Sequence, residues 1–146
     1  MIRYVVSCDG SGTTMDLPGG YGFVVETHAG DPIHESWGAR KVGSNNVMEY
    51  TAVRNALVWL RKNPSREAVI YSDSQVVVQQ INGVFSVRAP ELKKLYAECM
   101  LLLLEVVTAS VVWRPRNSTA GLKRADFLAG KARKAAMKKR FAIGGK

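Results

Sequence analysis

Four carboxylates occupy positions in this sequence from which they could act together on one substrate. Asp9 and Asp73 each come where an apolar, β-branched segment of strand type ends, and Glu49 and Asp126 each lie in the first turn of a predicted helix. In an open sheet with parallel strands, ligands bind at the carboxyl ends of the strands. If the strands before Asp9 and Asp73 are parallel neighbours, the four carboxylates can converge on one crevice.

Such a cluster needs a positive counter-charge. Two carboxylates about 4 Å apart repel by ~4 kcal/mol at an effective dielectric constant of about 20, so either their pKa values separate or a divalent cation neutralises them. Because all four side chains offer oxygen ligands, the hard ions Mg²⁺ and Mn²⁺ are favoured over zinc. Two such ions can activate a water molecule and stabilise the leaving oxygen in a phosphoryl displacement.

Each carboxylate also has an ordinary structural interpretation. Asp73 could cap a helix, and Glu49 could complement a helix dipole. Asp9 could belong to a plain turn, and Asp126 could pair with a basic neighbour, Arg124 or Lys123, at the surface. The catalytic interpretation therefore depends on a topology that brings the four side chains together.

The elements that must position these residues follow from hydrophobic periodicity and turn residues. A turn cluster at 29–32 joins the second and third strands as a hairpin. Three strands followed by alternating helices and strands predict a mixed sheet with helices packed on it. Strands are expected at 2–8, 19–27, 33–41, 68–72 and 108–113, and helices at 47–60, 75–81, 90–106 and 123–140. The last helix is expected to pack through Phe127, Leu128, Ala132, Ala135 and Ala136.

Positive charge is concentrated in the last quarter of the chain. The 146 residues carry a formal charge of +9, and residues 114–146 hold 11 basic side chains against one acidic side chain, whereas residues 1–113 are close to neutral. A polyanionic partner would explain this asymmetry, and so would a solvated tail. A carboxylate cluster beside a phosphate-binding surface is the combination that a metal-dependent nuclease needs.

Length and composition indicate one globular domain. We expect residues 1–140 to form a single catalytic domain and residues 141–146 a flexible tail. The composition, with 47% hydrophobic and 23% charged residues, excludes wholesale disorder, and the sequence has neither an apolar run that could span a bilayer nor a secretory signal. The two cysteines, Cys8 and Cys99, are too few for a disulfide scaffold, so a cytoplasmic location is expected.

Four blocks of the sequence follow one another in order: Asp9-Gly10-Ser11 with 18–22 (PGGYG), 45–49 (NNVME), 71–75 (YSDSQ), and 113–116 (WRPR) with 125–129 (ADFLA). Together they resemble type 1 ribonuclease H, over residues 1 to about 136. The resemblance implies a ribonuclease H-like α/β fold, in which a three-stranded antiparallel meander and two parallel strands form a five-stranded mixed sheet flanked by helices. It also implies endonucleolytic hydrolysis of the RNA strand of RNA–DNA hybrids. The implied cofactor is two Mg²⁺ ions, with Mn²⁺ as an alternative, and the products carry 5′-phosphate and 3′-hydroxyl ends.

Site residues carry over from this resemblance by position. Its hybrid-contacting positions are Asn45, Asn46 and Gln75, whose side-chain amides suit minor-groove acceptors and 2′-hydroxyl groups. The expected partner is an RNA–DNA hybrid, with no membrane and no protein partner, and the chain is expected to be a monomer. The catalytic and metal-binding set is Asp9, Glu49, Asp73 and Asp126, and further substrate contacts are expected from Gly10, Ser11, Ser44, Arg116, Lys131 and Lys134.

The sequence departs from the family pattern in three places. The loop at 114–121 lacks the histidine that many members carry, with Arg116 or Asn117 near its position, and Leu122 replaces a common asparagine. The basic handle of the family is absent, because residues 83–88 run almost directly into the helix that begins at Pro90. We expect the basic last helix to take over backbone binding through Lys131, Arg133, Lys134, Lys138, Lys139 and Arg140.

Two other functions are compatible with the same fold. The chain could be a non-catalytic nucleic-acid-binding module, although a pure binder gains nothing from carboxylates that face phosphates. It could also be a DNA-processing nuclease such as a strand transferase or resolvase. The sequence around Asn45-Asn46 and Asp73-Ser74-Gln75 favours the ribonuclease over both.

Overall fold

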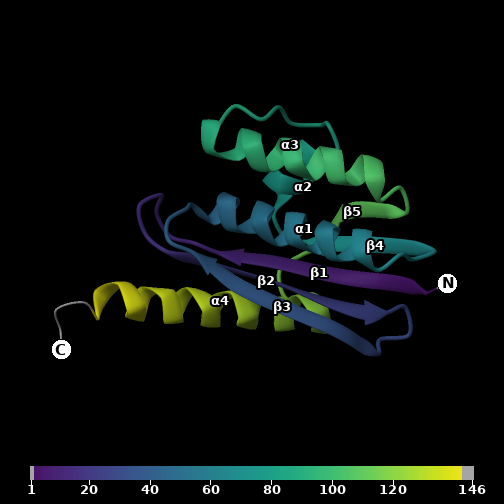
Figure 1. Ribbon diagram of the computed structural model, residues 1–146, viewed down its shortest axis with the longest axis horizontal. Coiled ribbons are helices and arrows are strands. Elements are labelled where there is room, and N and C mark those ends of the chain that lie inside the picture. The colour runs from purple at the N-terminus through teal and green to yellow at the C-terminus, as the bar shows by residue number, and fades with distance from the viewer. Residues whose placement is uncertain (1, 143–146) are drawn as a thin grey trace.

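A five-stranded mixed sheet forms the centre of the computed structural model, which describes residues 2–142 (Figure 1). The strand order is β3-β2-β1-β4-β5, with β1, β2 and β3 antiparallel, β4 parallel to β1, and β5 parallel to β4. This topology confirms the predicted fold class. The strands are β1 (Arg3–Ser11), β2 (Gly19–Thr27), β3 (Pro32–Arg40), β4 (Glu67–Ser72) and β5 (Ala109–Trp113).

The two ladders of β1 have different lengths. The parallel ladder with β4 ends at the pair Cys8–Ser72, whereas the antiparallel ladder with β2 continues to the pair Ser11–Gly20. The expected end of β1 at residue 8 is therefore wrong, because pairing with β2 keeps the chain extended through Asp9. Asp9 is the first residue of β1 beyond the parallel ladder.

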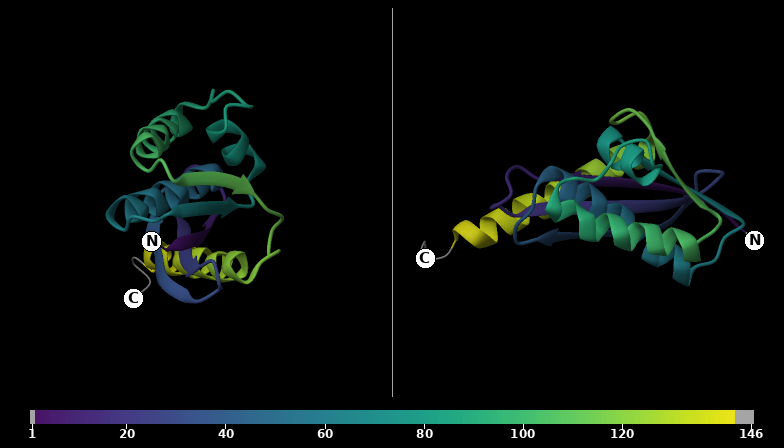
Figure 2. Two further views of the ribbon diagram at one scale, coloured as in Figure 1. Left: turned by 90° about the vertical axis from the view of Figure 1, so that its right-hand side faces the viewer. Right: turned by 90° about the horizontal axis from the view of Figure 1, so that it is seen from above.

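Helices cover both faces of the sheet (Figures 1 and 2). One face is covered by α1, with α3 packed on its outer side, and the opposite face is covered by α4. The hydrophobic core includes the fully buried side chains of Met48, Tyr50 and Leu57, all on α1. The helices are α1 (Asn45–Lys62), α2 (Gln75–Ile81), α3 (Pro90–Glu105) and α4 (Ala120–Phe141).

Hydroxyl caps fix where three of these helices begin. Ser44, Ser74 and Thr119 each accept a hydrogen bond from a backbone N–H in the first turn, of α1, α2 and α4 respectively. Helices α1 and α4 begin two and three residues earlier than expected. Glu49 and Asp126 consequently lie in the second turn of their helices and not in the first.

Helix α4 packs on the sheet through a narrow stripe of glycine, alanine and leucine side chains. Its close approach depends on glycines in β2: a Cβ atom on Gly22 would lie 3.1 Å from Cβ of Leu128. Phe127 and Ala135 were expected in this stripe, but both are exposed, since they project away from the sheet. The buried residues of α4 are Gly121, Leu122, Ala125, Leu128, Ala129 and Ala132.

The end of the chain differs slightly from the expected domain boundary. Helix α4 continues to Phe141, one residue past the predicted limit of the domain, and residues 143–146 of the predicted tail lie outside the described residues. Among residues 2–142, no helix combines the length and apolar character needed to cross a bilayer. Cys8 and Cys99 are both buried and unbridged.

Candidate active site

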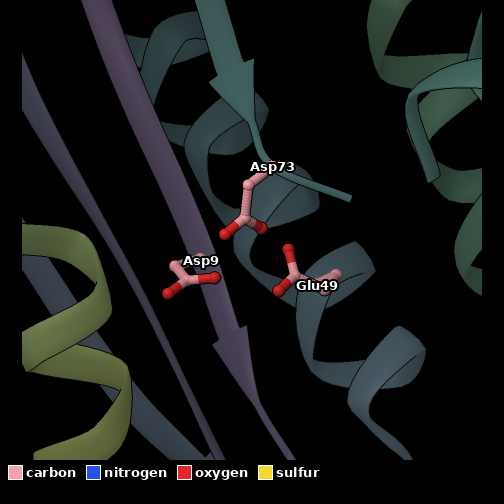
Figure 3. Close-up of side chains that lie close together, drawn as sticks. All are labelled: Asp9, Glu49 and Asp73. Atoms are coloured by element: carbon pink, nitrogen blue, oxygen red, sulfur yellow. The ribbon is translucent and has the colours of Figure 1, made fainter. Parts of the chain in front are cut away.

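Three of the predicted carboxylates meet where β1 and β4 diverge. Asp9 on β1, Glu49 on α1 and Asp73 immediately after β4 each offer an oxygen, and these oxygens all lie within 4.8 Å of one another (Figure 3). Asp126, on α4, lines the same cavity, which has a volume of about 220 Å³. Four elements that are distant in sequence therefore deliver their carboxylates to one place.

Burial distinguishes two members of this set. Glu49 is only 2% exposed and Asp9 only 4%, whereas Asp73 and Asp126 are partly accessible. Two buried like charges without a cation are costly. Because Glu49 lies in the second turn of α1 and is buried, the observations do not favour the interpretation that it only complements the helix dipole.

The Glu49 carboxylate is oriented by donors from two strands. The backbone N–H of Gly10 donates to Oε1 at 3.0 Å, and the Ser72 hydroxyl donates to Oε2 at 3.4 Å. Ser72 was not among the predicted site residues. Its signal in the sequence is weak: a polar residue at the end of the apolar strand that precedes Asp73.

A hydrogen bond to the backbone carbonyl of Asp73 fixes the position of this residue, so its carboxylate remains available to the site. The indole N–H of Trp113 donates to the Asp73 carbonyl oxygen at 3.2 Å. Ser74 caps α2, so Asp73 does not serve as the cap. Trp113 was not among the predicted site residues either, and its contact depends on the pairing of β5 with β4.

Arg116 supplies a positive charge at the open side of the cavity. Its guanidinium lies 3.5 Å from Oδ1 of Asp126. The expected alternative of a surface pair between Asp126 and Arg124 is wrong, because Arg124 pairs with Glu35 at 2.6 Å. Arg116 therefore places a positive charge beside the carboxylates.

The environment raises the pKa of three of the carboxyl groups. Burial raises the pKa of Asp9 from 3.8 to about 7, and contact with Asp126 adds to the shift. Burial and then repulsion by Asp9 raise the pKa of Glu49 well above its usual value. Burial also raises the pKa of Asp73, and the nearby Arg116 charge opposes this. The cavity thus gathers four carboxylates against the single positive charge of Arg116, and this excess of carboxylate oxygens fits a hard divalent cation.

The predicted substrate-binding residues divide into two groups. Gly10, Ser11, Asn45 and Arg116 line the cavity with the carboxylates. The Asn45 side-chain oxygen also accepts the backbone N–H of Gly12 at 3.1 Å, which ties the segment after β1 to the start of α1. Outside the lining lie Ser44, whose hydroxyl caps α1, together with Asn46 and Gln75.

The basic residues of α4 do not form one surface. Lys131 and Lys134 line a larger groove of about 710 Å³ that shares Ser11, Arg116 and Asp126 with the carboxylate cavity. On another side of α4, Lys139 and Arg140 line a separate cavity together with Arg40 and Lys41.

The family model for reverse transcriptase-like proteins matches residues 7–132. The chain therefore belongs to this family. The bifunctional protein Rv2228c of Mycobacterium tuberculosis is 33% identical over 136 residues, which cover 92% of this chain and 36% of that protein. The chain thus spans about a third of the length of the curated relatives that it matches.

Solved structures narrow the identification to type 1 ribonuclease H and confirm the resemblance predicted from the sequence. The N-terminal RNase H domain of Rv2228c is 32% identical with a TM-score of 0.88, and the match covers 96% of this chain and 99% of that chain. LC11-RNase H1, solved in complex with an RNA/DNA hybrid, is 31% identical with a TM-score of 0.82, covering 92% and 99%. RNase H1 from Halobacterium salinarum is 27% identical with a TM-score of 0.80, covering 89% and 96%.

Proposed function

We propose that this chain is a metal-dependent endoribonuclease that hydrolyses the RNA strand of RNA–DNA hybrids. The observation that carries the proposal is the convergence of Asp9, Glu49, Asp73 and Asp126 on one cavity. In a protein that only binds nucleic acid, carboxylates facing the phosphates would lower the affinity, so their presence supports catalysis. The complex of the similar LC11-RNase H1 with an RNA/DNA hybrid supports the same substrate class for this chain.

The carboxylates and their supports define what each residue would do. Asp9, Glu49 and Asp73 would hold the metal, with Asp126 completing the site from α4. When bound, two Mg²⁺ ions, or Mn²⁺, would lower the pKa of a water molecule and balance charge on the reacting phosphate. Gly10 and Ser72 keep both Glu49 oxygens in position, so the site is organised before the substrate arrives.

The reaction is a hydrolytic displacement at phosphorus. The oxygen of a water molecule forms the new bond to phosphorus and the water gives up one proton to solvent. The bond from phosphorus to the 3′ oxygen breaks, and the leaving oxygen takes up one proton from solvent. The products carry 5′-phosphate and 3′-hydroxyl ends. Arg116, at the mouth of the cavity, would attract the phosphate that enters beside Asp126.

Selection of a hybrid would depend on strand type and shape. The wide, shallow minor groove of A-like helices displays 2′-hydroxyl groups, which separate RNA from DNA. Asn45 lies in the cavity wall, and Asn46 and Gln75 lie at the starts of α1 and α2, from which their amides could reach the groove. The two buried, unbridged cysteines are consistent with a reducing compartment such as the cytoplasm.

Cleavage of a defined set of substrates tests the proposal. Labelled RNA–DNA hybrid, duplex RNA, duplex DNA and a four-way junction are incubated with the protein and Mg²⁺, Mn²⁺ or chelator. Asp73→Asn tests the site, and Glu67→Gln, at an exposed position elsewhere on β4, is the control for loss of one carboxylate.

The outcomes separate the candidate functions. Cleavage confined to the RNA strand of the hybrid, lost with chelator and with Asp73→Asn but kept with Glu67→Gln, is the expected result. Retarded mobility without cleavage would identify a binding module instead. Cutting of the junction or of DNA strands would identify a DNA-processing nuclease.

A further inference from the structure

A basic groove leads away from the carboxylate cavity along α4. The groove has a volume of about 710 Å³ and meets the cavity at Ser11, Arg116 and Asp126. Beyond this junction, its wall is formed by successive turns of α4. The two spaces therefore adjoin at these three residues, so that a strand whose phosphate occupies the cavity would pass next to the groove.

Three lysines face this groove without competing partners. Lys131, Lys134 and Lys138 follow one another at steps of three and four residues, which places them on one face of the helix. All three are exposed, and none forms an ion pair with any residue in the range 2–142. Asp126, at the junction, is the only acidic residue of the groove wall within that range. The groove thus presents unneutralised positive charge beside a site proposed to hold a phosphate.

The base of the groove is anchored. The Arg133 guanidinium donates to the Ser11 hydroxyl at 2.8 Å, which connects α4 to the end of β1. Near the junction, the ring of Phe127 is 55% exposed and lines the groove, where a base could stack on it without regard to sequence. Charge for a backbone and an apolar face for a base are combined on one side of α4.

The length of the groove fits several nucleotides. From Asp126 to Lys138 the helix rises by about 18 Å at ~1.5 Å per residue. A nucleic-acid strand advances by about 3.4 Å per nucleotide. The groove can therefore accompany about five nucleotides of one strand.

We infer that this groove, lined by Lys131, Lys134 and Lys138, binds phosphates of the cleaved RNA strand beyond the scissile bond. The inference rests on the proposed function and specifies which strand the groove takes. Because the cavity for the reacting phosphate adjoins the groove at Ser11, Arg116 and Asp126, the backbone nearest the groove is that of the strand being cut. The complementary DNA strand lies across the duplex from it.

Binding of hybrids with single-stranded extensions tests this assignment. A short hybrid is compared with the same hybrid extended by eight nucleotides of RNA at the 5′ or the 3′ end, or by eight nucleotides of DNA at either end. Affinities are measured with chelator present, so that no cleavage occurs. The groove variant is K131Q/K134Q/K138Q, and the control is K62Q/K94Q/K123Q, which removes the same charge from exposed positions outside the groove.

The wild-type protein should bind one of the two RNA-extended hybrids about tenfold more tightly than the short hybrid at ~0.1 M salt. The groove variant should lose this gain, and its salt-dependence slope for the extended hybrid should fall by about two, whereas the control variant should keep the gain. Equal gains from RNA and DNA extensions, no gain at all, or equal losses in both variants would overturn the inference. Wild-type cleavage of the short hybrid with Mg²⁺ tests the proposed function separately, since it needs no extension.

Discussion

The backbone N–H of Gly10 donates to the Glu49 carboxylate across 3.0 Å, which joins β1 to α1 inside the candidate active site. This contact requires close approach of the two backbones. A Cβ atom on Gly10 would collide with the backbone of Met48 and Glu49. The glycine after Asp9 is therefore needed for packing between strand and helix and not for a turn, since β1 continues past it.

Gly10→Ala should separate α1 from β1 and disturb the site. We expect the free energy of unfolding to fall by about 1–3 kcal/mol, as for other overpacked sites, and cleavage of the hybrid to fall by a larger factor than stability alone explains. Urea unfolding and cleavage rates measure the two effects. Gly130→Ala is the control: its new Cβ meets nothing within 4 Å in α4, and it should stabilise the helix by up to about 1 kcal/mol. Equal effects of both substitutions on stability would contradict this account.

The carboxylates should differ in how much cleavage depends on them. Asp73→Asn removes an oxygen from the group of three, whereas Asp126→Asn removes a more peripheral one that is paired with Arg116. We expect a loss of at least about a hundredfold in kcat for Asp73→Asn and a smaller loss for Asp126→Asn. Single-turnover cleavage at saturating Mg²⁺ measures both. A larger loss for Asp126→Asn would mean that α4 supplies a principal metal ligand.

The stability of the metal-free protein should depend on pH in an unusual direction. Burial raises the pKa of Asp9 from 3.8 to about 7, so the folded state binds more protons than the unfolded state between these values. The free energy of unfolding should therefore decrease as pH rises from about 4 to about 7 in the presence of chelator. Glu49, whose pKa is also raised, acts in the same direction.

Urea unfolding in chelator at several pH values measures this dependence. Mg²⁺ should restore stability at neutral pH, because it binds only the folded site. Asp9→Asn should flatten the pH dependence and make the metal-free protein more stable at pH 7 than the wild type. A wild-type protein whose stability in chelator rises over this range would show that the carboxylates are neutralised in another way.

The Ser7 hydroxyl is the one buried side-chain polar atom without a hydrogen-bond partner among residues 2–142. It lies under α4, where a Cβ atom on Gly121 would collide with it. Because Ser7→Ala removes an unsatisfied polar group, we expect it to leave the free energy of unfolding unchanged or to raise it by up to about 1 kcal/mol. Ser7→Val should lower it by overpacking the same contact. Thermal unfolding of both variants tests this, and a clear destabilisation by Ser7→Ala would reveal a partner for the hydroxyl.

Much of the fold could be predicted because helices and strands are indicated by local patterns of hydrophobic and turn residues. Hydrophobic periodicity and turn residues located the nine elements of the described chain, and their order predicted a mixed sheet with helices packed on it. The end of β1 could not be predicted, since it is set by pairing with β2 and not by the glycines that follow Asp9. The exposure of Phe127 has a similar origin: glycines in β2 admit α4 so closely that only a narrow stripe of the helix is covered.

The same distinction between local and tertiary signals applies to the residues of the candidate site. The four carboxylates could be predicted, because each lies near the end of a strand or the beginning of a helix and the topology brings such positions together. Ser72 and Trp113 could not, because their contacts with Glu49 and Asp73 depend on the distance between elements. The division of the basic residues of α4 between two surfaces likewise depends on how the helix is rotated against the sheet.

The rate of RNA-strand cleavage in a hybrid, measured as Mg²⁺ is titrated into the wild-type protein and into Glu49→Gln, tests the central claim most directly. The glutamine keeps an oxygen to accept the Gly10 N–H, so the variant should fold, which circular dichroism can verify. The wild type should be inactive in chelator and reach a saturating rate with Mg²⁺, and the variant should remain slower by about a hundredfold or more at every Mg²⁺ concentration. Cleavage by the wild type in chelator, or cleavage by the variant at the wild-type rate, would contradict the account.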